Sequence, residues 1–416
     1  MSTVTDKPIF IKRATGIREI KERVSEVFDT FKGALPASKK ASILLKPNLN
    51  ANMNALTGNT TDLRILAGVI EGLQKRGYTN IKIGEGTNSG YYRYNISVIS
   101  RLKVDALARF YSIDTVDLNY SKPYEIEFED GVRASVARDV VEADFLINLP
   151  KLKTHFEAGM SVCLKNLMGT LVGQENKKKT HKSLAKNILR INDNIKPGLH
   201  IVDGLIAMEG LGPTRGMPVK TSLIMAGTDP YLLDMVSARL AGFNYKKVRT
   251  LAAAEELGKL TAGHIEAAAS LDISGFEMKF APPVAGALAT FIHHPSRQKY
   301  FLAVRNTKLF NYICSTKTAG KVLYATGLRQ DVFIDDEMDF KGLVLDRQRC
   351  KGHKKCSEYC PVGIKLPDDL ERPGNGCIEC LYCYMVCPEE AIVFKGKLGF
   401  VDEQIRQYDK IVRKTA

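Results

Sequence analysis

Seven cysteines lie close together near the C-terminal end of the chain. The sequence has nine cysteines in 416 residues, and seven of them fall between positions 350 and 387. Disulfides at this density are typical of short secreted domains, whereas this long chain begins without an apolar leader. We therefore expect the cysteines to be thiolate ligands of a metal group.

The spacing of the cysteines indicates which metal group they bind. The second half of the module reads C-x2-C-x2-C-x3-C-P and consists of Cys377, Cys380, Cys383 and Cys387. It resembles the bacterial ferredoxin run, in which three cysteines bind one [4Fe-4S] cluster and the fourth binds a second cluster. Zinc sites more often use two separated C-x2-C pairs, so zinc is the weaker interpretation.

The first half of the module repeats these steps with one substitution. His353 stands where a cysteine would be, in the series Cys350, His353, Cys356 and Cys360. The ferredoxin resemblance implies that cluster one is bound by Cys377, Cys380, Cys383 and Cys360. Cluster two is left with Cys350, Cys356 and Cys387. It would be a [3Fe-4S] cluster, a [4Fe-4S] cluster with an open iron, or a cluster ligated by His353; an outward-pointing His353 at a degenerate site is the alternative.

A second group of chemically capable residues lies in the N-terminal half. Its members follow apolar strands or sit in polar loops, and the candidate catalytic residues are Lys46, Lys153, His155, Lys165 and Asp203. Lysine and histidine can bind a carboxylate or phosphate and donate protons during a reduction. Each lysine could equally be an ordinary surface residue. Asp203, Glu209 and Asp234 could hold a metal, balance the lysines or cap a helix.

Alternating strands and helices must position this second group. We expect strands at 41–46, 80–84, 115–118, 144–149, 200–203 and 222–226, and helices at 61–76, 96–111, 183–195, 232–240 and 248–257. This alternation predicts an α/β fold with a mostly parallel sheet and flanking helices. Reactive groups in such sheets gather outside the carboxyl ends of the strands.

The composition divides the chain into four parts. We expect an α/β domain at 1–275, a basic linker with two docking helices at 276–340, a small α+β ferredoxin-like iron–sulfur domain at 341–400, and a helical tail at 401–416. The docking helices are expected at 297–305 and 308–315.

The net charge of the chain favours an anionic partner. Sixty Lys and Arg against 46 Asp and Glu give a net charge of +14, and the excess of basic residues is concentrated at 176–200 and at 281–330. The second of these segments contains no acidic residue. Such asymmetry favours a phosphate substrate, an acidic carrier protein, nucleic acid or a membrane surface, and a solvated basic face is the alternative. Nucleic acid is disfavoured because aromatic residues are not interleaved with the lysines. With no apolar run long enough to span a membrane, we expect a cytoplasmic protein, and a homodimer is compatible with the sequence.

Several motifs between residues 40 and 245 resemble the DUF362 family. The matching segments are 45–48, 149–155, 163–169, 203–204, 208–210, 212–213 and 227–230, together with Asp234. Coupling of this domain to a ferredoxin module is also typical of the family. The resemblance implies an iron–sulfur oxidoreductase-like protein and leaves the reaction open.

These patterns favour a reductase with two iron–sulfur clusters. An external donor such as ferredoxin or flavodoxin would supply electrons, and an anionic small molecule held by the α/β domain would receive them. One alternative is an electron-transfer adaptor that docks a partner at 281–330. Another is a lyase or isomerase that uses an open iron near His353 without net redox. No P-loop or dinucleotide motif supports a nucleotide cofactor.

Overall fold

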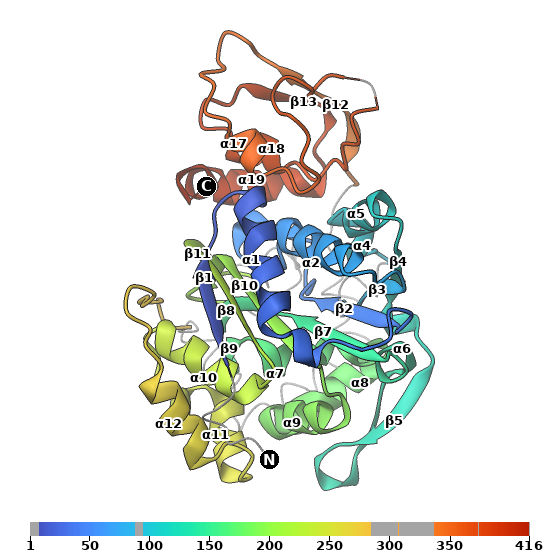
Figure 1. The fold of residues 1–416 in the computed structure, drawn as a ribbon, viewed down its shortest axis with the longest axis vertical. Helices are drawn as coiled ribbons and strands as arrows, with labels where there is room; N and C mark the ends of the chain where they lie inside the picture. The colour runs from blue at the N-terminus through green and yellow to red at the C-terminus, as the bar shows by residue number, and fades with distance from the viewer. Residues whose placement is uncertain (1–7, 88–94, 284–306, 308–336, 373, 416) are drawn as a thin grey trace.

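A mixed sheet forms the centre of the larger domain. The computed structural model describes residues 8–87, 95–283, 307, 337–372 and 374–415 (Figure 1). Its nine-stranded sheet has the order β1-β11-β10-β7-β2-β3-β4, with β8 beside β10 and β9 beside β8. The strands are β1 Phe10–Arg13, β2 Ile43–Pro47, β3 Ile81–Glu85, β4 Asp114–Asp117, β7 Phe145–Leu149, β8 Lys151–His155, β9 Gly159–Ser161, β10 Leu199–Glu209 and β11 Met217–Gly227.

Most neighbouring strands in this sheet are parallel. Strands β4, β3, β2, β7 and β10 run in one direction, while β11 and β1 are antiparallel to their neighbours. The predicted α/β class with a mostly parallel sheet is therefore confirmed. The central strands are nearly continuous apolar runs because helices bury both of their faces.

Helices cover the sheet on both faces. Helices α1 Ile17–Thr30, α2 Leu63–Lys75 and α5 Val104–Phe110 share one core with Ile43 and Leu45 of β2. Helices α9 Leu184–Asn194, α10 Pro230–Leu240, α11 Arg249–Glu256 and α12 Ala262–Ser270 pack on the opposite face. Leu44 points to that opposite side, against α9 and the hairpin of β5 Pro123–Glu127 and β6 Arg133–Ala137. This alternation follows from the two-residue period of a strand.

One predicted element is wrong in detail, and some elements were not predicted. The helix expected at 96–111 is split into α4 Val98–Arg101 and α5, because Lys103 adopts a left-handed backbone with φ of 61°. The strand expected at 144–149 is followed directly by strand β8 along β10, an element that the sequence analysis did not predict. The sequence analysis also missed β1 and α1. Shorter helices at α6 Arg138–Val141, α7 Cys163–Asn166 and α8 Gly173–Thr180 complete this domain.

The cysteine module forms a small α+β domain on top of the α/β domain (Figure 1). It contains the antiparallel strands β12 Asp339–Leu345 and β13 Ile392–Lys397 and the helices α17 Lys355–Glu358 and α18 Tyr382–Val386. The C-terminal helix α19 Phe400–Thr415 lies between the two domains. Its Gln404 bonds to Asn52 and Asn54, and its Tyr408 donates to Gly216 O over 3.3 Å.

Most of the predicted linker lies outside the described residues, including both expected docking helices. Its first residues, up to 283, run along the α/β domain, where Phe280 N donates to Ala241 O over 3.1 Å. Among the helices that the structure describes, none combines the length and apolar character needed to cross a membrane.

Candidate functional site

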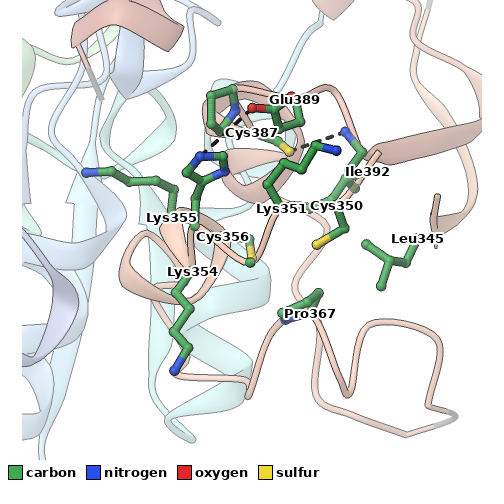
Figure 2. Close-up of a pocket in the computed structure, with 14 residues that line it drawn as sticks. Leu345, Cys350, Lys351, Lys354, Lys355, Cys356, Pro367, Cys387, Glu389 and Ile392 are labelled. Atoms are coloured by element: carbon green, nitrogen blue, oxygen red, sulfur yellow. Dashed lines mark hydrogen bonds and ion pairs between the residues drawn. The ribbon is translucent and has the colours of Figure 1, made fainter. Parts of the chain in front are cut away.

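Three cysteines of the predicted cluster two surround one open pocket. Cys350, Cys356 and Cys387 line a space of about 370 Å³ that includes open solvent (Figure 2). His353 and Glu389 line the same pocket, and His353 Nε2 lies 3.9 Å from Glu389 Oε1. The structure thus places His353 on the same pocket as the three cysteines.

The remaining four cysteines form a second group. Burial and the nearby Cys360, Cys383 and Cys377 raise the pKa of the Cys380 thiol well above its ordinary value. Burial, and then the nearby Cys387 and Cys350, raise the pKa of the Cys356 thiol to about 11. The Cys383 thiol is raised in pKa by burial and by Cys377, Cys360 and Cys356, so the two predicted sets of cysteines lie close to each other.

Backbone hydrogen bonds reach several of the cysteine sulfurs. Backbone amides donate to three of the sulfurs, from Ile364 to Cys360 (3.4 Å), from Glu379 to Cys377 (3.4 Å) and from Ala391 to Cys387 (3.3 Å). Hydrogen bonds of this type to cysteine sulfur are among the features that set cluster potentials.

The predicted cluster one lies beside the α/β domain. Asn54 Nδ2 donates to Cys380 O over 3.1 Å, and Leu63 N donates to the Tyr382 hydroxyl over 3.1 Å. The guanidinium of Arg64 lies 3.9 Å from the ring centre of Tyr359, the residue before Cys360. These contacts come from residues 48–64, which we call the bridging segment.

A buried ion pair lies just before the bridging segment, at the carboxyl edge of the sheet. Lys46, near the end of β2, lies 2.8 Å from Glu85 at the end of β3. Glu85 also accepts from Leu49 N (3.0 Å) and Gly86 N (2.9 Å). A side chain at Gly169 would collide with the Glu85 carboxylate, which explains a glycine at this position. Burial lowers the pKa of Lys46 despite its partner.

Asp203 holds the other end of the bridging segment. Its carboxylate accepts from Lys151 Nζ (2.9 Å), from Asp62 N (2.7 Å) and from Leu205 N (3.0 Å). Asp62 in turn pairs with Arg64 over 2.8 Å. All four charged side chains are buried, and together they are formally neutral. Asp203 is therefore fully engaged in a structural network and does not face an open site.

Lys153 differs from the other buried lysines because no carboxylate of the described residues pairs with it. Its ammonium donates to three neutral oxygens, Asn48 Oδ1 (3.0 Å), Asn50 Oδ1 (2.6 Å) and Asn59 O (2.6 Å). Burial, and then the positive charges of Lys165 and Lys151, lower the pKa of Lys153 well below its ordinary value. Burial without a counter-charge disfavours the charged form of a lysine, and a bound anion would favour that form again.

His155 and Lys165 extend this positive environment. His155 Nδ1 accepts from the backbone of Glu157 (3.1 Å) and Ala158 (3.3 Å), which leaves the proton on Nε2. Burial and then Lys165 lower the pKa of His155 well below its ordinary value, so it is neutral. Burial lowers the pKa of Lys165 to about 8. Lys165 thus lowers the pKa of both Lys153 and His155, and we call these three residues the cationic group, in which His155 itself is neutral.

The structure separates the five candidate residues into two sets. Lys46 and Asp203 belong to buried ion pairs, whereas the remaining three make up the cationic group. The other two candidate acids are also engaged: Glu209 accepts from Ala281 N (2.7 Å), and Asp234 accepts from Cys163 N (2.7 Å) at the start of α7. The sequence analysis missed Glu85 and the three oxygens around Lys153. A carboxylate at the end of a strand was the available signal for Glu85. The Asn-rich segment after β2 was the available signal for the oxygens around Lys153.

Most basic side chains of the stretch at 176–200 contact groups of their own domain. Lys177 donates to Gly86 O and Thr87 O, each over 2.8 Å. Lys186 and Arg190 pair with Glu256 (3.0 Å) and Glu129 (2.7 Å). These contacts are typical of a surface that stabilises its own domain.

Comparisons with known proteins agree with the motifs. The family described as "Domain of unknown function (DUF362)" matches residues 43–239, and the family described as "4Fe-4S dicluster domain" matches residues 342–398. The thylakoid-associated protein sll1697 of Synechocystis sp. (strain ATCC 27184 / PCC 6803 / Kazusa) is 30% identical over 229 residues, which cover 52% of this chain and 68% of that protein.

Two solved structures were also found, both at low similarity. The lactate racemase apoprotein from Thermoanaerobacterium thermosaccharolyticum has 13% identity and a TM-score of 0.31, covering 53% of this chain and 54% of that one. A protein from Thermotoga maritima has 13% identity and a TM-score of 0.28, covering 50% of this chain and 55% of that one. This chain spans about half the length of each of these two proteins.

Proposed function

Since the chain belongs to the DUF362 family and carries a 4Fe-4S dicluster domain, we propose that it is an iron–sulfur oxidoreductase acting on an anionic small molecule. In this proposal two ferredoxin-type clusters, bound by the cysteines at 350–387, supply single electrons. The α/β domain binds the substrate and provides protons. A ferredoxin-type domain by itself supports iron–sulfur electron transfer.

The observation that carries the proposal is the position of Lys153. Its ammonium is buried without a carboxylate partner among the described residues, and all three of its acceptors, on Asn48, Asn50 and Asn59, belong to the bridging segment. The same segment donates from Asn54 to Cys380 O. The bridging segment therefore contacts both Lys153 and the loop of cluster one. In this proposal, electrons pass from that loop to a substrate bound near Lys153.

The cationic group can perform the binding and the proton transfer. Lys153 would attract a carboxylate or phosphate, because an anion would supply the counter-charge that the protein leaves out. Lys165, with a pKa of about 8, is mostly protonated at neutral pH and can donate a proton to a reduced substrate. Neutral His155 can donate a hydrogen bond from Nε2 without adding a further positive charge.

A second candidate function is supported by the pocket of cluster two. Three thiolates with His353 and Glu389 on the same pocket could leave one iron open to an exogenous ligand. Such an iron could act as a Lewis acid in a lyase or isomerase reaction without net redox. Dependence of turnover on an electron donor distinguishes the two functions.

The test combines cluster chemistry with ligand binding. Anaerobically reconstituted protein should contain about eight irons, and dithionite should produce signals of reduced clusters in EPR. Small carboxylates and phosphates should then be screened by thermal shift, with Lys153→Gln as the comparison. We expect stabilisation by at least one anion class in the wild type and its loss in Lys153→Gln. Clusters that dithionite cannot reduce, or anion binding that is unchanged in Lys153→Gln, would refute the proposal.

A further inference from the structure

The two predicted cluster sites have different surroundings. The loop of cluster one is packed on the α/β domain, where Asn54 contacts Cys380 O and Lys103 pairs with Glu379 over 2.7 Å. The pocket of cluster two opens to solvent, and the loop that carries Cys350 is exposed from Lys351 to Lys354. Cys377 of cluster one is exposed as well, so the charge of the surrounding loop, more than solvent exposure, is what distinguishes cluster two.

The exposed loop around cluster two is strongly basic. Five basic side chains lie within nine residues of this loop, and we call them the basic rim: Arg347, Arg349, Lys351, Lys354 and Lys355. Figure 2 shows the three lysines spread around the sulfurs of Cys350, Cys356 and Cys387.

Nearby carboxylates neutralise only part of the basic rim. Arg349 pairs with Asp346 (3.2 Å) and Lys355 with Glu358 (3.5 Å). Within the part of the chain that the structure describes, no carboxylate pairs with the other three members, all of which are exposed. Glu389, on the same pocket, lies against His353 instead. A net positive surface therefore frames the exposed cluster site.

We propose that the basic rim is the docking surface for an acidic one-electron carrier protein, and that cluster two is where electrons enter. This inference rests on the proposed function and adds the direction of electron flow, from cluster two to cluster one to the bridging segment. Charge complementarity supports it, because a positive rim steers a negative partner and can raise association rates by about 10- to 1,000-fold. Steering to this rim would place the carrier's redox group over the exposed cluster.

The test compares two variants of equal net charge. Lys351→Glu with Lys354→Glu reverses two rim charges, and Lys40→Glu with Lys395→Glu reverses two exposed lysines elsewhere. Reduction of the oxidised clusters by flavodoxin hydroquinone is followed by stopped-flow absorbance. At about 50 mM salt we expect the rim variant to be reduced at least tenfold more slowly than wild type, and the control to stay within about twofold. At about 1 M salt the difference should disappear, because the Debye length falls to about 3 Å.

A small cationic reductant and a cross-linking experiment supply independent readouts. Methyl viologen radical cation should reduce the rim variant at least as fast as wild type, which shows that its clusters are intact. Carbodiimide cross-linking to flavodoxin should give products at Lys351 or Lys354 in the wild-type chain.

Equal rates with flavodoxin in all three proteins, or cross-links confined to other lysines, would overturn the docking surface while leaving the proposed function intact. Loss of binding to anionic lipid vesicles with unchanged flavodoxin rates would point to a membrane surface and also overturn it. Clusters that neither reductant reduces would overturn the proposed function, and the docking surface with it.

Discussion

Replacing Asp203 with asparagine should destabilise the fold by an amount that the structure allows us to work out. The Asp203 carboxylate is buried and accepts three hydrogen bonds, from Lys151 Nζ, Asp62 N and Leu205 N. An asparagine keeps only one oxygen, so its amide group must face at least one of these donors. Lys151 also loses the charge that lies 2.9 Å from its ammonium.

The charge effect is the larger of the two. A buried donor left without an acceptor costs about 1–3 kcal/mol, and a buried ion pair that loses one partner costs about 3–5 kcal/mol. These costs overlap, because the same ammonium is both the donor and the charge. Asp62 attracts Lys151 as well, which favours the lower end. We therefore expect Asp203→Asn to lower the free energy of unfolding by about 3 kcal/mol.

Equilibrium urea unfolding under anaerobic conditions measures this change, with iron content as the check on cluster retention. The matched control is the double variant Asp203→Asn with Lys151→Met, which removes the stranded ammonium. It should recover about 1–2 kcal/mol relative to the single variant, as expected for two residues in direct contact. A single variant as stable as wild type that has lost substrate binding would refute this reasoning, because Asp203 would then act on the substrate and not on the fold.

Three further predictions concern the cationic group, cluster two and the interface. Anion binding should weaken as pH rises through about 8, since the Lys165 ammonium is present below its pKa and lost above it, and Lys165→Arg should make that loss smaller in a calorimetric titration, with Lys153 still free to titrate. His353→Cys should add a fourth thiolate to cluster two and lower its potential in an EPR-monitored redox titration; an unchanged spectrum would show that His353 lies outside the coordination sphere. Tyr382→Phe should cost about 0.5–1.5 kcal/mol in thermal unfolding, because Leu63 N loses its acceptor, and an unchanged Tm would contradict this contact.

The sequence was sufficient to predict the central parallel strands of the sheet and the cysteine module. Strands such as β2 and β7 are nearly continuous apolar runs, interrupted by Lys46 and Asn148, because both of their faces are buried, and that pattern is local. The motif at 377–388 has fixed spacing because the ligands of one cluster come from neighbouring turns of chain. Both features can be recognised without knowing what lies next to them in space.

The partners of the buried charges could not be predicted in the same way. Lys46, Lys151 and Lys153 all follow or end apolar strands, and nothing local distinguishes them. Lys46 is neutralised by Glu85, 39 residues away, and Lys151 by Asp203, 52 residues away. Lys153 faces only neutral oxygens. The difference between two structural lysines and one candidate for anion binding therefore depends on long-range pairing.

The bridging segment explains how the two domains could act as one enzyme. Its first half supplies two of the acceptors around Lys153, its middle contacts Cys380 through Asn54, and its last residues, Asp62 and Arg64, join Asp203 to Tyr359. A shift of this segment would therefore alter both the anion-attracting lysine and the loop of cluster one. Two domains joined only by a flexible tether would gain nothing from a buried, charge-neutral network at their junction. The cost of burying four charges there is understandable if their geometry fixes the distance that an electron must cross.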